Sequence, residues 1–224
     1  MSEENTLSMQ YGGDAAALFE QRNRECNRHA NEHFYSLLPS IVGKSLLDAG
    51  CGEGSDLLHY VGLGAKCFGL DSGADMVHVA RKRGIDACLG NFESLPFADA
   101  TFDVVVSKYA IQTSAHVPKV LSEFGRVLKS GGILQYLAVH PMRQFIERKK
   151  PAQNYFKQTI VDSVLFGGAL TVKEPTHTLN EYLNPDFLRE FEITHFEERE
   201  HFSASEQIDG QTYPCYFIVQ AKKR

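Results

Sequence analysis

LLDAGCGEG, residues 46–54, carries an apolar stretch into a turn in which every second residue is glycine. Glycine has no Cβ, so the chain can turn sharply there and a ligand can lie directly against the main chain. A buried strand that leads through such a turn into a helix is typical of the ligand-binding edge of a doubly wound α/β sheet. The stretch therefore predicts a nucleotide-binding α/β fold.

Strands and helices alternate after this turn. We expect buried strands at 45–49, 65–70, 85–89, 102–107 and 133–139, with helices at 73–83 and 117–128. The helix after the first strand is expected to be capped by Ser55 or Asp56 and to bury Leu57, Leu58 and Val61. Alternation of this kind predicts right-handed crossovers and a parallel sheet.

The pattern changes on both sides of this core. A helix is expected over 14–38, ending before Pro39. Residues 142–190 are richer in aromatic and polar groups and predict an inserted cap, followed by two closing strands at 191–197 and 213–221 that form an edge hairpin. The expected organisation is a single domain over 1–224, with a helical lid (1–44), a cofactor-binding core (45–140), a substrate cap (141–190) and closing strands (191–224).

Composition narrows the class of protein. The 224 residues suit one α/β domain, and the net charge of −5 does not suggest a nucleic-acid binder. No apolar run reaches the roughly 18–20 residues that span a bilayer. The five cysteines contain no CxxC pair, which favours reduced thiols and argues against a disulfide framework or a cysteine zinc site. We therefore expect a cytoplasmic monomer or homodimer with no metal, nucleic acid or membrane partner.

Residues 45–140 resemble the class I S-adenosylmethionine-dependent methyltransferases, particularly their small-molecule branch. Five segments carry the resemblance in order and with the expected spacing: 46–54, 69–72 with Met76, 90–97, 102–107 and 126–132. The resemblance implies a Rossmann-like, mostly parallel seven-stranded sheet whose last strand is antiparallel. It also implies S-adenosylmethionine as cofactor, S-adenosylhomocysteine as product, and transfer of a methyl group to N, O, S or C of a small-molecule acceptor by in-line displacement.

The expected cofactor contacts centre on an acid. Asp71 lies 21 positions after Gly50 at the end of the second strand, where a carboxylate can accept from both ribose hydroxyls. Asn91 stands where relatives often carry aspartate, and Gln112 stands where many carry histidine. The other cofactor contacts that the resemblance implies are Tyr11, Arg28, Asp48, Gly50, Cys51, Gly52, Ser72, Met76, Phe92 and Ser107.

Candidate groups on the acceptor side follow the later strands. His140 and His177 are candidate proton acceptors because imidazole titrates near neutral pH. His140 can equally cap its strand, and the preferred reading of His177 is an exposed residue of the cap. A carboxylate or free-amine acceptor would need no such base. Tyr109, Arg143 and Tyr155 are candidate acceptor contacts.

Two other functions remain open on the sequence alone. A nicotinamide-dependent oxidoreductase also uses a glycine-rich turn and a later acid, but its third glycine falls at the position of Ser55 here. A non-catalytic cofactor-binding regulatory subunit would retain the same motifs.

Overall fold

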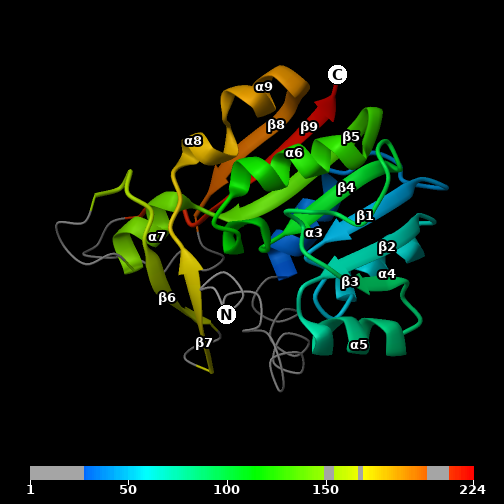
Figure 1. Cartoon of the computed structure of the whole chain (residues 1–224), viewed down its shortest axis with the longest axis horizontal. Helices are drawn as coiled ribbons and strands as arrows, with labels where there is room; N and C mark the ends of the chain where they lie inside the picture. Colours follow the sequence, from blue (N-terminus) through cyan, green and yellow to red (C-terminus); the bar gives the residue numbers. More distant parts are fainter. Residues whose placement is uncertain (1–27, 149–153, 166–168, 201–211) are drawn as a thin grey trace.

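The computed structural model describes residues 28–148, 154–165, 169–200 and 212–224. A seven-stranded sheet forms its centre, with strand order β3-β2-β1-β4-β5-β9-β8 (Figure 1). Its strands are β1 (Ser45–Ala49), β2 (Lys66–Asp71), β3 (Ala87–Leu89), β4 (Phe102–Lys108), β5 (Leu128–Val139), β8 (Phe191–Arg199) and β9 (Tyr216–Lys223). Strands β1 to β5 pair in parallel, and β9 runs antiparallel to both β5 and β8. The predicted doubly wound, mostly parallel sheet with an antiparallel last strand is confirmed.

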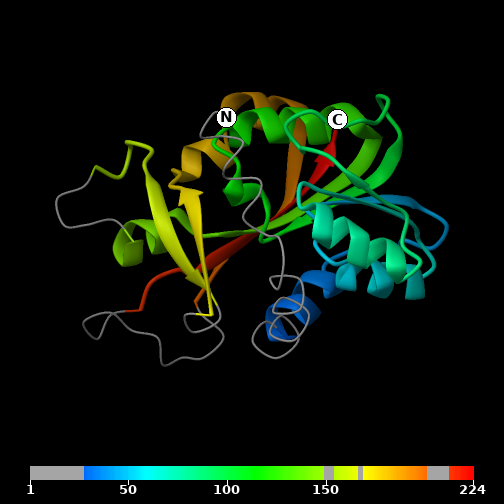
Figure 2. The same ribbon diagram turned by 60° about the horizontal axis from the view of Figure 1, so that its bottom comes forward.

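Helices cover both faces of the sheet (Figure 2). Helices α3 (Arg28–Ser36), α4 (Ser55–Gly62) and α5 (Ala74–Lys82) lie on one face, and α6 (Val117–Val127) lies on the other. Adjacent strand residues therefore enter different cores: Leu46 packs in the cluster with Leu57 of α4, whereas Leu47 packs in the cluster with Phe124 of α6. A strand buried on both faces needs apolar residues at successive positions, which explains the unbroken apolar run before the glycine turn.

Helix α4 differs from the sequence expectation in two respects. Its N-cap is Gly54 in a left-handed conformation, with no side-chain cap hydrogen bond, so neither Ser55 nor Asp56 caps it. Leu58 and Val61 are 43 % and 51 % exposed, and Tyr60 is buried in their place. The predicted inward face was right for Leu57 and wrong for Leu58 and Val61, because the helix starts one residue after the last glycine and turns Leu57 and Tyr60 toward the sheet.

The boundaries of the later strands also move. Strand β5 begins at Leu128, directly after α6, so the expected glycine terminator at 129–132 is the first part of a strand with an irregular register against β4. The closing strands pair side by side as expected, but β9 starts at Tyr216 and not at residue 213. The expected helix over 14–38 is observed at Arg28–Ser36, and its residues 14–27 lie outside the described part of the chain.

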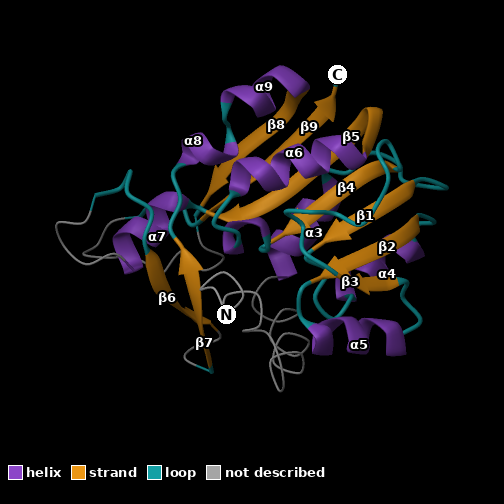
Figure 3. Ribbon diagram, in the orientation of Figure 1, coloured by secondary structure: helices purple, strands orange, loops and turns teal. Residues whose placement is uncertain are grey.

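The segment predicted as a cap divides into two parts. Helix α7 (Pro141–Arg148) and the antiparallel pair β6 (Ile160–Leu165) and β7 (Leu170–Pro175) stand beside the main sheet (Figure 3). Helices α8 (Leu179–Tyr182) and α9 (Pro185–Glu190) contact α6 instead, so they belong to the helical layer. No helix among the described residues is long and apolar enough to cross a membrane.

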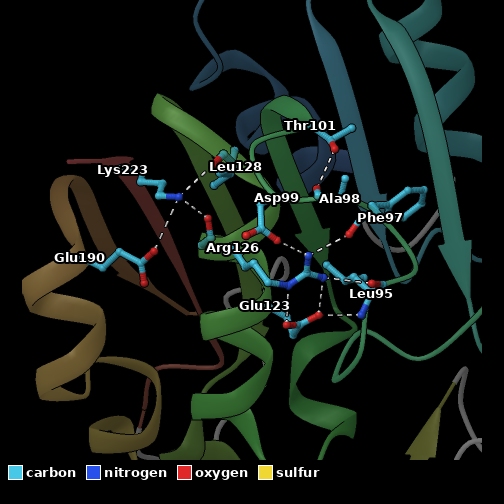
Figure 4. Close-up of polar contacts among 11 residues, drawn as sticks. Leu95, Phe97, Ala98, Asp99, Thr101, Glu123, Arg126, Leu128, Glu190 and Lys223 are labelled. Atoms are coloured by element: carbon cyan, nitrogen blue, oxygen red, sulfur yellow. Dashed lines mark hydrogen bonds and ion pairs between the residues drawn. The ribbon is translucent and has the colours of Figure 1, made fainter.

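Arg126 fastens the long connection between β3 and β4 to helix α6 (Figure 4). Its guanidinium donates to the carbonyl oxygens of Leu95 and Phe97 and pairs with Glu123 and Asp99. These contacts raise the pKa of Arg126, with the Glu123 hydrogen bond as the largest cause.

Replacing Arg126 with methionine is expected to lower the free energy of unfolding by about 2 kcal/mol, because the carbonyl groups and Glu123 lose a charged donor. The side chain is about one-third exposed, so water replaces part of the loss. Urea unfolding measures the effect, and Lys119→Met, an exposed change on the same helix, serves as control. Equal midpoints for the two variants would contradict this role.

Candidate active site

The glycine turn lies at the point where the sheet order reverses, between β1 and β4, which is where doubly wound sheets bind ligands. Gly50 has φ +90°, and a Cβ there would lie 2.3 Å from the Cβ of Ala110. Gly52 has φ +53°, and a Cβ there would have nothing within 4 Å. The first glycine is therefore required by packing, whereas the second leaves an open stretch of backbone.

Asp71 holds this turn from the end of β2. Its Oδ2 accepts from the backbone N–H of Gly52 at 2.8 Å, and its Oδ1 accepts from Gly73 at 2.8 Å. Burial raises the pKa of Asp71, and these backbone hydrogen bonds oppose the rise. A carboxylate has about four lone-pair sites, and the backbone of Ser72 is a third donor to it, so the carboxylate retains capacity for about one further donor.

A second acid lies beneath the turn. Asp48 is buried at the end of β1, and desolvation together with the nearby Asp56 raises its pKa well above the usual range. Lys108 opposes this shift and forms an ion pair with Asp56, Nζ to Oδ1 at 2.7 Å. Acids gathered in a buried site stabilise a positively charged ligand.

Lys108 also joins the N-terminal helix to the site. Its Nζ donates to Asn31 Oδ1 at 2.8 Å and lies 5.3 Å from the ring centroid of Tyr35. The hydroxyl of Tyr35 donates to Asp56 as well. Sequence reasoning missed this group, although a lysine at the end of an otherwise apolar strand could have signalled it.

The other predicted cofactor residues divide into exposed and packed positions. Asn91 is exposed, and its Oδ1 accepts from the backbone N–H of Glu93 at 2.8 Å. Phe92 lies beside the glycine turn, with Cε1 3.9 Å from the Cβ position of Gly50. Met76 and Cys51 are buried, and the Cys51 side chain packs in the core below the turn.

The end of β4 brings three predicted residues together. Ser107 is buried, and its hydroxyl donates to the carbonyl oxygen of Ala49 at 2.8 Å, which ties β4 to β1. Tyr109 has φ +53°, an uncommon conformation for a residue with a side chain. Gln112 is buried and donates through Nε2 to the carbonyl oxygen of Tyr109 at 2.7 Å. Backbone strain of this kind is frequent at functional sites.

His177 closes over this group from the loop after β7. It is buried, and its Nε2 lies 2.9 Å from the carbonyl oxygen of Gln112, so this nitrogen is the donor. Its Nδ1 lies 3.3 Å from Glu181 Oε2 but forms no hydrogen bond with the described residues. The Tyr109 hydroxyl and Gln112 Oε1 are likewise buried without a partner in the described chain.

His140 follows directly after the last residue of β5, and both nitrogens of its ring contact protein groups. Its Nδ1 accepts from the backbone N–H of Met142 at 3.0 Å, and its Nε2 lies 2.8 Å from Glu198 Oε1. Since Nδ1 accepts, Nε2 carries the hydrogen and donates to Glu198. Burial lowers the pKa of His140, so the neutral ring predominates at neutral pH.

The remaining predicted residues lie farther along the same edge. Arg143 of α7 pairs with Glu147, and the Tyr155 hydroxyl accepts from the backbone N–H of Leu179 at 3.1 Å. Arg28 is exposed at the start of α3, and Ser72 is exposed directly after Asp71. Tyr11 lies outside the described residues.

S-adenosylmethionine fits this set of groups. The bare backbone at Gly52 allows close approach, the Asp71 carboxylate can accept from a sugar diol, and the Asp48 region is suited to positive charge. Fold and site together define a nucleoside-binding α/β protein of the doubly wound class.

Comparisons with known proteins agree with this class. Residues 47–136 match the family described as "Methyltransferase domain". A malonyl-[acyl-carrier protein] O-methyltransferase from Erwinia pyrifoliae is 31 % identical over 182 residues, which cover 75 % of this chain and 67 % of the relative. A demethylmenaquinone methyltransferase from Lactococcus lactis is 34 % identical over 131 residues, which cover 54 % of this chain and 51 % of the relative.

A solved S-adenosylmethionine-dependent methyltransferase from Mesorhizobium loti has the same fold, with a TM-score of 0.71, 21 % identity and coverage of 86 % of this chain and 96 % of that chain. The chain belongs to the class I S-adenosylmethionine-dependent methyltransferases. It spans about half the length of several curated relatives, for example 49 % of the malonyl-[acyl-carrier protein] O-methyltransferase from Pectobacterium atrosepticum. The family membership answers the nicotinamide alternative in favour of S-adenosylmethionine.

Proposed function

We propose that this protein transfers a methyl group from S-adenosylmethionine to a small-molecule acceptor. The observation that carries the proposal is the group of three buried polar atoms at the end of β4 that have no partner among the described residues. They are the Tyr109 hydroxyl, Gln112 Oε1 and His177 Nδ1. Buried polar atoms normally have hydrogen-bond partners, so each of these three atoms is suited to a contact with a polar ligand.

One set of residues binds the cofactor, and a second set positions the acceptor. When bound, S-adenosylmethionine supplies an electrophilic methyl group on its sulfonium. The glycine turn and Asp71 hold the nucleoside end, and Asp48 and its acidic neighbours favour positive charge nearby. Tyr109, Gln112 and His177 fix the direction from which an acceptor atom approaches, and such positioning can lower the barrier by several kcal/mol.

We further propose that the acceptor atom needs no deprotonation before it attacks the methyl group, as is the case for a carboxylate or a free amine. The lone pair of His140 accepts from Met142, and its N–H donates to Glu198. The Nε2–H of His177 donates to the carbonyl oxygen of Gln112. The other ring nitrogen, Nδ1, lies 3.3 Å from Glu181 Oε2. The relative named for O-methylation of a malonyl group supports an oxygen acceptor, whereas the relative that acts on demethylmenaquinone supports a larger ring acceptor.

A panel of acceptors with isotopically labelled methyl donor tests the proposal on the full chain. Release of S-adenosylhomocysteine together with a labelled small-molecule product is the supporting result. Tight binding of S-adenosylhomocysteine without turnover on any carboxylate, amine, thiol or phenol acceptor would favour a non-catalytic cofactor-binding subunit instead.

His140→Gln is expected to change kcat by less than about 10-fold with a carboxylate acceptor, because no proton has to be removed. The rate should stay level above pH 6.5, since burial lowers the pKa of His140 from that value and the ring is already neutral there. His78→Gln, an exposed change on α5, is the control. A loss of about 100-fold or more, restricted to His140→Gln, would establish His140 as a base.

A further inference from the structure

Three metal-ligating side chains meet on the face of the sheet that α3 covers, at the edge formed by β8. His33 lies in the last turn of α3, and His195 and Glu197 occupy alternate positions of β8, which places them on the same face of the strand. One donor atom from each residue lies within 4.8 Å of the other two. The sequence separates His33 from Glu197 by 164 positions, so only the fold assembles the group.

Both imidazole rings point at one carboxylate oxygen. Glu197 Oε1 forms a close contact with Nε2 of His33 and lies 3.5 Å from Nε2 of His195. Glu197 Oε2 lies 3.4 Å from Nη1 of Arg199, which leaves Oε1 directed at the two histidines.

His195 Nε2 has no adequate partner in this arrangement. It is a buried atom with no hydrogen bond to any described residue. If Nε2 carries a hydrogen, its donor is unsatisfied at 3.5 Å from the carboxylate; if it does not, its lone pair faces a negative charge. A cation between the three donors removes both penalties, because neutral imidazole and carboxylate are ordinary ligands of divalent metals.

We propose that His33, His195 and Glu197 form a binding site for a divalent transition metal, with Zn²⁺ as the best match. Two nitrogen ligands and one carboxylate are a common zinc donor set, with water completing the tetrahedron. Zinc bonds near 2.0–2.1 Å place tetrahedral ligands about 3.3 Å apart. The 3.5 Å pair already fits, the closer His33–Glu197 pair must open, and no pair has to close by more than about 1.5 Å, because all the donors lie within 4.8 Å of one another. The side chains are 29 %, 34 % and 18 % exposed, so a metal ion can reach them.

The site would clamp α3 to the sheet edge. Among other contacts, helix α3 is held by Phe34 in the core, by the Gln135 amide on the Phe34 carbonyl at 2.6 Å and by Lys108 on Asn31. Because Lys108 also pairs with Asp56 near the cofactor turn, a metal at the β8 edge would stabilise the helix that forms one wall of that site. The proposal does not depend on the acceptor or on methyl transfer.

The test uses the full chain after removal of metal with a chelator. Co²⁺ titration followed by visible absorption should give one equivalent of a tetrahedral d–d band, and Zn²⁺ should displace it. A sulfur-to-cobalt charge-transfer band would instead indicate a cysteine site and would overturn the assignment. Free Zn²⁺ at 100 times Kd should also raise Tm by about 5 °C or more.

Three variants and a control locate the site. His195→Ala and Glu197→Gln are each expected to weaken Co²⁺ binding at least 10-fold, and His33→Ala should do the same. His78→Ala, an exposed histidine on α5, should leave affinity and stoichiometry unchanged. Unaltered Co²⁺ binding in His195→Ala and Glu197→Gln, or no binding by the original protein, overturns the proposal. If His33→Ala fails to fold, the two β8 variants decide the question.

Discussion

Asp71→Asn is expected to weaken the binding of S-adenosylhomocysteine by about 100-fold or more. Hydrogen bonds to a charged group contribute about 1.5–3 kcal/mol each, and this carboxylate has room to accept from a sugar hydroxyl. The substitution also turns an amide N–H₂ toward the backbone N–H of Gly52 or Gly73, where two donors meet. The turn then loses one of its supports in addition to the ligand contact.

Calorimetric titration with S-adenosylhomocysteine measures this change. Asp86→Asn, an exposed substitution just before β3, is the matched control and should bind like the original protein. A thermal unfolding curve for Asp71→Asn separates lost affinity from lost structure. An affinity within threefold of the original would remove Asp71 from the cofactor site.

Lys108→Met is expected to lower the free energy of unfolding by about 3–5 kcal/mol, the usual cost of leaving one half of a buried ion pair unpaired. The side chain of Lys108 is 4 % exposed and that of Asp56 is 14 % exposed, so water can replace little of the interaction. Asn31 and the face of Tyr35 lose their contacts with the ammonium group at the same time. Helix α3 should loosen as a result.

A double-mutant cycle isolates the pair. Asp56→Leu combined with Lys108→Met should be more stable than Lys108→Met alone, because no unpaired buried charge remains. Lys66→Met, an exposed change at the start of β2, is the control. Urea unfolding measures the original protein, the two single variants, the double variant and the control. If the two single losses simply add in the double variant, Lys108 and Asp56 are not energetically coupled.

The local sequence predicted the sheet well because burial on both faces leaves a clear pattern. Strands such as Val104–Val106 are apolar at consecutive positions, and the turn after β1 has glycine at Gly50, where φ is +90°. Asp71 was predicted as a cofactor contact from its spacing after the glycines at the end of a strand. That role stays a prediction; the structure adds that the carboxylate accepts from the backbone of Gly52 and Gly73. These features depend on neighbours close in sequence.

The side-chain contacts of the site could not be predicted in the same way. His140 and His177 were expected to be candidate bases, and that role stays a prediction; the structure adds that Met142, Glu198 and Gln112 contact their ring nitrogens. Leu58 and Val61 were misplaced because a one-residue change in the start of α4 rotates its faces.

By itself, the sequence determined the parallel, doubly wound core, the glycine turn and the acid at the end of β2, because each is set by backbone geometry and burial over short distances. Only the tertiary structure determined the Lys108–Asp56 pair and the His33, His195 and Glu197 cluster. Their members lie 52 and up to 164 positions apart, and no local pattern records which side chains the packing of α3 against the sheet will bring together.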